Sequence, residues 1–469
     1  MKFRKILIAN RGEIAIRIAK AANALGIKTL AIYPQDDINS LHIEIADEAQ
    51  MLDGIGVPAY LNAENILGIA NSNNCDAIHP GYGFLSENAR FAEICQSEGV
   101  TFIGPNIEHL ELFGNKNVAK QAAIDAGVPV IQGIDRGATF EEVLDFFDSL
   151  PENKGVMLKA VAGGGGRGSR AVLKREELER SFRRCKSEAK RSFGNDDIYV
   201  EEFLPQTRHI EVQIVGDSEG EIVHLWDREC SVQRRFQKLV EIAPAPNLSE
   251  ELRTQIINSA MRLAESVGYS NIGTFEFLVP SDRSTEENPF VFIEANARLQ
   301  VEHTVTEEVT GIDIVQTQIQ IAEGASISDL DIRNRSTQPP VGFAIQTRVN
   351  METLTSAGNV RPSNGELEVY DPPMGTGVRI DGCGYTTYTT NTSFDSLLAK
   401  LIVHSESDQF SHVIKKSLHA LSEFRIEGIL TNISFLRNVL LHEDFYNGRI
   451  HTTWVDENMA RLADSSNNS

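Results

Sequence analysis

Alternating apolar and polar residues between positions 289 and 303 predict an extended strand with one apolar and one functional face. A two-residue period places successive side chains on opposite faces of a strand. One parity carries Val291, Ile293, Ala295, Ala297, Leu299 and Val301, and the other carries Glu294, Asn296, Arg298, Gln300 and Glu302. The second set contains groups that bind ions, phosphates or small acids. A half-buried strand with a solvated second face is the alternative interpretation.

Short apolar runs and helical patterns alternate through the N-terminal part of the chain. Residues 13–25 repeat apolar side chains at helical spacing and stop at Gly26, as a helix end does. Because strands and helices alternate, an open parallel sheet is expected here. The loop at residues 10–13 reads Asn-Arg-Gly-Glu rather than G-x-G-x-x-G, so a dinucleotide site has no support. The expected strands are residues 5–9, 29–33, 75–79 and 100–103.

A glycine-rich stretch, residues 162–170, separates two predicted strands at 156–161 and 171–173. A loop between two strands forms a hairpin flap, unlike a P-loop, which leads into a helix. Consecutive glycines let backbone N–H groups close on phosphate oxygens without Cβ clashes. A flexible linker is the alternative, but Lys159 before the loop and two arginines within it favour phosphate binding.

A helix is expected to run from Asn115, as its N-cap, to Ala126. Lys116 falls in its first turn, where a cation opposes the helix dipole. That placement favours a bound anion nearby, although a surface lysine explains it equally well.

Two predicted strands each carry an acidic side chain, and the two carboxylates would lie close together if the strands are neighbours. Residues 273–277 alternate so that Glu276 lies on the face opposite two phenylalanines, and Glu294 lies on the strand described first. With Asn296, these carboxylates beside a phosphate-binding flap form the oxygen-rich set that Mg²⁺ prefers. Residues 198–204 and 209–215 are further predicted strands. Arg228, Arg234, Arg235 and Lys238 are expected to form a local positive region.

The C-terminal part begins after a polar segment, residues 326–340, which ends in Pro-Pro and marks a domain boundary. Residues 342–350 alternate as a strand with Arg348 on its polar face. Residues 395–401, 411–424 and 432–441 have the patterns of helices. The polar tail, residues 464–469, is expected to be disordered.

Composition narrows the classes of function. The chain has 469 residues, 41% hydrophobic, and a net charge of -22, which fits several globular domains. The charge argues against nucleic acid or anionic membranes as partners. The five cysteines form no C-x-x-C pair, so neither a zinc site nor a disulfide framework is indicated. Without a signal peptide or a transmembrane run, a cytoplasmic or similarly reducing location is expected.

Six motifs in order resemble the biotin carboxylase subunit or domain of biotin-dependent carboxylases, in the ATP-grasp superfamily. They are IANRGEIAIR from Ile8, HPGYGFLSEN from His79, GGGGRG from Gly163, RECSVQRR from Arg228, EANARLQVEH from Glu294 and RVNME from Arg348. The pattern around Arg348 is closest to the single-chain, multidomain acyl-CoA carboxylases. The resemblance implies an α/β architecture. Its parts would be an N-terminal parallel-sheet domain (1–114), an ATP-grasp domain (115–330) with a mobile lid (131–204), a mixed-sheet C-terminal domain (331–457) and a polar tail (458–469).

The resemblance also implies a reaction in which MgATP, bicarbonate and biotin give ADP, phosphate and carboxybiotin through carboxyphosphate. Glu302 would be the general base, and Arg348 would stabilise the biotin enolate. The cofactors would be ATP, Mg²⁺ or Mn²⁺, and biotin. Biotin would be carried by a partner domain, because the chain lacks an Ala-Met-Lys-Met attachment motif. A carboxyltransferase and a second copy of the chain would be further partners. The other implied site residues are Lys116, Lys159, Gly164, Gly165, Gly166, Glu201, Leu204, His209, Gln233 and Phe236 for ATP, Glu276, Glu294 and Asn296 for the metal, Lys238, Arg298, Gln300 and Val301 for bicarbonate, and Tyr82 for biotin.

Three residues depart from the family pattern, and all fall in the implied nucleotide pocket. Phe236 replaces the usual His, Ser169 replaces Met, and Glu202 stands where a basic residue is common. Because Phe236 cannot hydrogen-bond ribose or phosphate, weaker ATP binding is expected. The alternative functions are a catalytically impaired nucleotide-binding paralogue and another ATP-grasp ligase. Retention of Arg348 and of the bicarbonate-binding set speaks against both.

Overall fold

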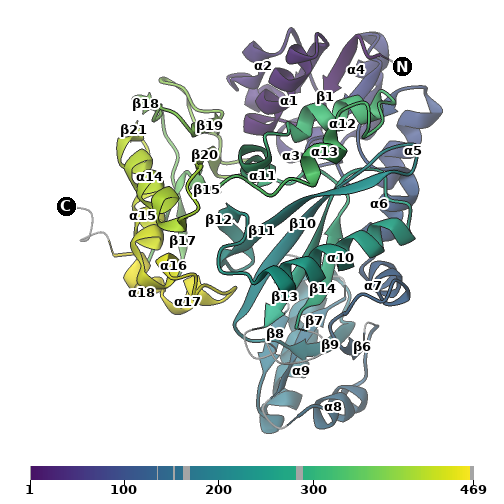
Figure 1. Cartoon of the computed structure of the whole chain (residues 1–469), viewed down its shortest axis with the longest axis vertical. Coiled ribbons are helices and arrows are strands. Elements are labelled where there is room, and N and C mark those ends of the chain that lie inside the picture. The colour runs from purple at the N-terminus through teal and green to yellow at the C-terminus, as the bar shows by residue number, and fades with distance from the viewer. Residues whose placement is uncertain (1, 135, 152–153, 162–168, 281–288, 465–469) are drawn as a thin grey trace.

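The computed structural model describes residues 2–134, 136–151, 154–161, 169–280 and 289–464 (Figure 1). An N-terminal domain lies at the top of Figure 1, a long central sheet runs below it, and a small lid lies at the bottom. None of the helices within these ranges has both the length and the apolar character needed to span a bilayer.

The N-terminal sheet is parallel, as its apolar runs predict. Its order is β3 (Glu48–Met51), β2 (Lys28–Tyr33), β1 (Lys5–Ile8), β4 (Ala77–His79) and β5 (Thr101–Phe102). Ile6 and Ile8 share a core with α1 (Gly12–Ala24), while Leu7 packs with α4 (Ala63–Ser72) and α5 (Ala89–Ser97) on the other face. The loops after β1 and β4 leave the carboxyl end of the sheet, where open sheets bind ligands.

One continuous eight-stranded antiparallel sheet forms the centre of the molecule. The β12–β15 pair joins the predicted ATP-grasp and C-terminal domains, with Val240 opposite Thr347. The described strand pairs of the C-terminal part are antiparallel, where a mixed sheet is predicted. The order is β14 (Val291–Asn296), β13 (Asn271–Pro280), β10 (Thr207–Gly216), β11 (Ile222–Arg234), β12 (Gln237–Ala243), β15 (Phe343–Asn350), β20 (Leu397–Ser405) and β19 (Val378–Gly382).

Helices cover the central sheet. α10 (Glu250–Ser266) packs on β10 and β11. α14 (Phe410–Glu423) and α15 (Ile433–Leu441), both predicted from their patterns, pack on the C-terminal strands. α7 (Lys116–Asp125) starts at the predicted cap, because the Asn115 side chain accepts from the backbone of Asn117 and Val118. The remaining elements are α2 (His42–Ile45), α3 (Gly56–Tyr60), α6 (Ile107–Gly114), α11 (His303–Thr310), α12 (Ile314–Ala322), α13 (Ile332–Ser336), α16 (Glu443–Tyr446), α17 (Trp454–Glu457), α18 (Met459–Leu462), β16 (Glu352–Leu354), β17 (Val360–Pro362), β18 (Val369–Asp371) and β21 (Arg425–Glu427).

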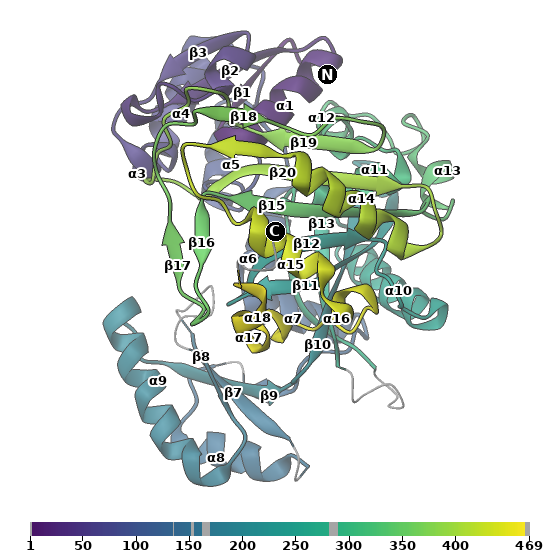
Figure 2. The same ribbon diagram turned by 90° about the vertical axis from the view of Figure 1, so that its left-hand side faces the viewer.

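The lid is a separate four-stranded sheet, seen at the bottom of Figure 2. Its order is β6 (Gly133–Ile134), β9 (Ile198–Phe203), β7 (Gly155–Ala160) and β8 (Ser169–Val172). Helices α8 (Phe140–Ser149) and α9 (Leu178–Phe193) pack on one face of it. β7 and β8 pair antiparallel, which confirms the strands predicted on either side of the glycine-rich stretch. Residues 162–168 of that stretch, like most of the predicted disordered tail, lie outside the described residues.

Two predicted elements are wrong. Residues 397–401 begin strand β20 instead of forming a helix, because a short, mostly apolar run buried between two strands has no periodicity that distinguishes a strand from a helix. The strand predicted over residues 289–303 ends at Asn296, and α11 begins at His303. Ala297 and Leu299 are buried and anchor the intervening turn, so alternation continues although the strand does not.

Candidate active site

One cavity of about 1410 Å³ lies between the lid, the central sheet and the loop after β4. Every predicted site residue within the described part of the chain lines it, whereas Gly164, Gly165 and Gly166 lie outside that part. The lining side chains come from α7, the lid strands, the β11–β12 hairpin, β13, β14, the turn after β14, and β15. The fold therefore brings together residues from most of the length of the chain.

The two predicted strands are neighbours, β13 and β14. Glu276 and Glu294 lie directly opposite each other on them and therefore project from the same face of the sheet. Asn296 Nδ2 donates to Glu276 Oε1 at 2.7 Å, and Lys116 Nζ lies 3.3 Å from Glu294 Oε2. The side chain of Glu294 is 39% exposed and can reach a ligand in the cavity. Two carboxylates on one face offer the hard oxygen ligands that Mg²⁺ requires, so these residues fit the predicted metal.

A neighbouring set of possible ligand atoms is less suited to a metal. His209, Glu211 and Glu276 present ligand atoms within 4.8 Å of one another. However, Glu211 already pairs with Arg228 at 2.5 Å and with Lys238 at 2.7 Å. Glu211 is fully buried and does not line the cavity, whereas Glu294 lines it with a 39% exposed side chain, so the pair Glu276 and Glu294 is the better metal site.

Lys238 lies where the two ends of the predicted site meet. Its Nζ is 3.3 Å from Glu276 Oε1 and 2.6 Å from Glu302 Oε1. An extended strand would carry Glu302 about 20 Å beyond Asn296, at about 3.3 Å per residue. The turn at residues 297–302 removes most of that distance, and one ammonium group can therefore contact both carboxylates.

Opposite charges control the protonation of these buried groups. Burial raises the pKa of Glu302, but Lys238 and Arg348 outweigh it and hold that pKa well below its usual range. Burial lowers the pKa of Lys238, but its three carboxylate neighbours raise it well above the usual value. His209 Nε2 lies 2.7 Å from Glu276, which raises the pKa of His209 despite burial. Glu302 is therefore ionised at neutral pH, the form that a proton acceptor requires.

Two arginines complete this end of the cavity. Arg348 pairs with Glu241 at 2.5 Å and with Glu302 at 3.1 Å. Arg298 Nη1 donates to Gln300 Oε1 at 2.8 Å, and its Nε lies 3.0 Å from Glu87 Oε2. Each guanidinium plane is thus oriented by neighbouring side chains beside Glu302.

The other end of the cavity carries the predicted nucleotide residues. Lys159 on β7 pairs closely with Glu201 on β9. Phe236 is 60% exposed and occupies the turn of the β11–β12 hairpin with a φ of 66°. Glu202 is 6% exposed and lies 3.7 Å from Lys154. The nearby cation explains why an acidic side chain is tolerated at a buried position where the family commonly has a basic residue.

Sequence reasoning missed the buried charges that support the cavity. Glu211, Arg228 and Glu241 are buried and hold Lys238 or Arg348, directly or through each other. The sequence did contain an indication for Glu211, because alternation places Glu211 on the same face of its predicted strand as His209. The prediction that four cations form one local positive region is wrong. Of the four, only Lys238 lines the cavity, and Arg234 instead donates to the Gly358 carbonyl at 2.6 Å.

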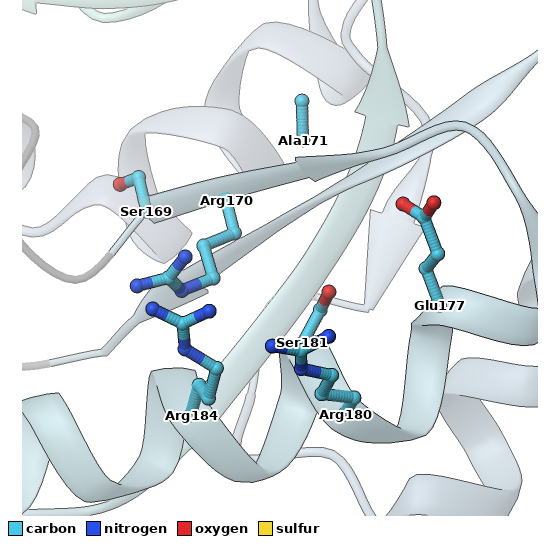
Figure 3. A pocket seen from close by; sticks show the side chains of 7 residues that line it. All are labelled: Ser169, Arg170, Ala171, Glu177, Arg180, Ser181 and Arg184. Carbon is cyan, nitrogen blue, oxygen red and sulfur yellow. The ribbon is translucent and has the colours of Figure 1, made fainter.

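A second hollow, of about 520 Å³, lies on the lid between β8 and α9 (Figure 3). It is lined by Ser169, Arg170, Ala171, Glu177, Arg180, Ser181 and Arg184. Arg170 pairs with Glu188, and Ser169 also lines the large cavity. With one of its arginines already paired and an acid in its wall, this hollow is a charged surface of the lid.

Family models match three consecutive parts of the chain. They are the N-terminal domain of biotin carboxylase at residues 2–110, the ATP-binding domain of the carbamoyl-phosphate synthase L chain at 115–330, and the C-terminal domain of biotin carboxylase at 346–457. Pyruvate carboxylase of Bacillus subtilis is 46% identical over 460 residues, which cover 96% of this chain and 39% of that protein. The chain thus spans about two fifths of the length of the curated relatives it matches.

Solved structures agree with these matches. The biotin carboxylase domain of Hydrogenobacter thermophilus 2-oxoglutarate carboxylase, in complex with MgADP, ADP and bicarbonate, is 38% identical with a TM-score of 0.89, covering 98% of this chain and 99% of that one. A single-chain, multidomain long-chain acyl-CoA carboxylase is 41% identical with a TM-score of 0.85, covering 98% of this chain and 43% of that one. The chain therefore belongs to the biotin carboxylase family of ATP-dependent ligases.

Proposed function

We propose that this chain carboxylates biotin at the expense of ATP and bicarbonate, as the first half-reaction of a biotin-dependent carboxylase. One observation carries the proposal: Lys238 contacts both Glu276, a proposed metal ligand, and Glu302, the proposed base. A group held at this point lies within reach of the metal, the base and both arginines. That is the geometry needed to deprotonate bicarbonate beside a phosphoryl group.

The bicarbonate end of the cavity would hold and deprotonate the nucleophile. Lys238, Arg298, Gln300 and the backbone of Val301 would bind bicarbonate, and the Arg298 fork suits a planar oxyanion. Glu302 would take the proton from the bicarbonate hydroxyl, leaving an oxygen able to attack the γ-phosphorus of ATP. Carboxyphosphate and ADP would be the products of that step, and closure of the lid would keep water from the carboxyphosphate.

The nucleotide end of the cavity would hold ATP. Glu276, Glu294 and Asn296 would hold Mg²⁺, which neutralises charge on the transferred phosphoryl group. Lys116, Lys159, His209 and Gln233 would contact the phosphates and ribose, together with Gly164, Gly165 and Gly166 of the flap. Glu201 and Leu204 would bind the adenine, and Phe236 would lie near the ribose and phosphates. Lys116 and Lys159 each pair with a carboxylate, so nucleotide binding exchanges one anionic partner for another.

Biotin and the partner proteins would approach from the side of Tyr82 and Arg348. Arg348 would stabilise the biotin enolate, and Tyr82 would line the biotin pocket. Biotin would arrive on a carrier domain, and a carboxyltransferase would use the product. The related Hydrogenobacter domain is a dimer, which supports a homodimer here. The proposed domains remain residues 1–114, 115–330 and 331–457.

ADP release with and without bicarbonate and free biotin tests the function. Stimulation by both supports biotin carboxylation, whereas turnover independent of bicarbonate would indicate another ligase, and nucleotide binding without turnover an impaired paralogue. Glu302→Gln should abolish biotin-stimulated turnover while ATP still binds. Glu427→Gln is a matched control, because Glu427 pairs with Arg425 at the surface. Unchanged turnover in Glu302→Gln would remove Glu302 as the base.

A further inference from the structure

Lys400 is a buried cation among the buried apolar residues 398–403 of strand β20. Its side chain is 0% exposed, and its neighbours Ala399 and Leu401 in β20 are equally buried. Its Nζ donates to the Val301 carbonyl at 3.1 Å and lies 3.0 Å from Glu13 Oε2. Burying an ammonium group is costly unless its partners are well placed. An apolar residue at this position would avoid the free-energy cost of burying a charge. The two contacts of Lys400 therefore suggest a role other than stability.

The contacts of Lys400 join three distant parts of the chain. Glu13 lies in the first turn of α1 in the N-terminal domain and accepts a hydrogen bond from the Tyr82 hydroxyl. Tyr82 and Val301 both line the large cavity. One ammonium group therefore connects the C-terminal sheet with the loop after β4 and with the turn after β14.

Strand pairing places Lys400 beside Arg348, the residue proposed to stabilise the biotin enolate. Lys400 on β20 lies directly opposite Arg348 on β15, so both side chains project from the same face of the sheet. Arg348 contacts the side chain of Glu302, and Lys400 contacts the carbonyl of the preceding residue, Val301. Asp381, also opposite Lys400, forms a two-point pair with Arg379 at 2.8 and 2.9 Å.

The turn that Lys400 contacts is held by side chains rather than by a strand ladder. Within the described residues, no strand pairs with residues 297–302. The backbone N–H and the Nδ1 of His303 lie 3.3 and 2.7 Å from the Gln300 carbonyl and close one side of the turn. Lys400 fixes the next carbonyl, that of Val301, and Gln300 and Glu302 are the residues on either side of Val301.

We propose that Lys400, paired with Glu13, is a positioning residue that sets the bicarbonate-binding turn. This inference rests on the proposed function. By holding the Val301 carbonyl, Lys400 aims Gln300 and Glu302 into the cavity, and through Glu13 it keeps Tyr82 in register with them. A displacement of reacting groups by about 1 Å can cost about 100-fold in rate, so the support matters even though Lys400 touches no substrate.

Steady-state kinetics of Lys400→Met test the role. We expect the KM for bicarbonate to rise at least about tenfold and the biotin-stimulated kcat to fall, because the turn loses its register. The KM for ATP should stay within about twofold, because the nucleotide residues lie on other elements. A general loss of structure would lower kcat and raise the KM for ATP along with the KM for bicarbonate. Lys416→Met is the matched control, since Lys416 Nζ donates to the His404 carbonyl at 2.7 Å in the same part of the fold, away from the cavity.

A second variant keeps the test decisive if Lys400→Met folds poorly with an unpaired Glu13. The double variant Lys400→Met/Glu13→Gln removes both charges and should fold, while showing the same selective rise in the KM for bicarbonate. Wild-type bicarbonate kinetics in either folded variant would overturn the positioning role. Absence of stimulation by bicarbonate and biotin in the wild-type chain would instead overturn the proposed function, so the two failures are distinct.

Discussion

Replacing Arg228 by Met should destabilise the central sheet more than any surface change of the same kind. Arg228 is 0% exposed and donates to Glu211 at 2.5 Å, Gln213 at 2.9 Å, Thr306 at 2.9 Å and Thr274 at 3.1 Å. Met keeps much of the apolar volume but provides none of these donors. Glu211 would keep its ion pair with Lys238, and three acceptors would lose a partner.

The size of the effect follows from burial. Removing one partner of a buried ion pair costs about 3–5 kcal/mol, because the other charge is left uncompensated. Lys238 offsets part of the charge of Glu211, so we expect a loss near the lower limit, about 3 kcal/mol. That is a large part of a total stability of about 5–15 kcal/mol, and the variant should still fold.

Urea unfolding and hydrogen exchange of the β10 and β11 amides measure this loss. Arg333→Met is the control, because the pair of Arg333 with Glu221 is at the surface and screened by solvent. The double variant Arg228→Met/Glu211→Leu should recover stability, since both buried charges are gone. Equal losses in Arg228→Met and Arg333→Met, or a double variant less stable than Arg228→Met, would refute the reasoning.

Three further predictions concern protonation, nucleotide and metal. In a histidine NMR titration, His209 should titrate above its usual pKa of 6.5, and Glu276→Gln should lower that value. Its contribution to stability is therefore complete below pH 6.5 and lost as the pH rises through the folded-state pKa, a dependence that His209→Gln should lack in urea unfolding. Phe236→His should lower the KM for ATP without loss of stability, because histidine tolerates the φ of 66° and adds a hydrogen-bonding group; a higher KM would contradict this. Glu294→Gln should raise the Mg²⁺ concentration needed for half-maximal turnover, and an unchanged requirement would remove Glu294 as a ligand.

Periodicity in the sequence was enough to predict most strands and the faces on which Glu276 and Glu294 lie, because each depends on alternation that the backbone preserves. The direct pairing of the two residues is known from the structure. Periodicity failed to predict the structure of residues 297–302, where the same alternation of apolar and polar residues occurs in a turn instead of a strand. Ala297 and Leu299 are buried whether the chain stays extended or turns, so the turn that brings Glu302 to Lys238 left no periodic signal.

Buried charged residues were the second feature that the sequence did not predict. Arg228 looked like part of a basic surface, because nothing in its immediate sequence shows that Glu211 faces it from β10. Lys400 was hidden in a run predicted to be helical, and its partners, Glu13 and Val301, are distant in sequence. Such contacts are set by tertiary packing, which local patterns do not encode.

The pairing of β12 with β15 has a practical consequence for dissecting the protein. Polypeptides cut between these strands, around residue 341, would each expose an unpaired row of backbone donors and acceptors, a template for aggregation. Each half should therefore aggregate when it is expressed alone. The two halves should associate through the pairing of β12 with β15 when they are expressed together. The lid, whose sheet shares no ladder with the rest of the described chain, is the more promising piece to isolate or to exchange between relatives.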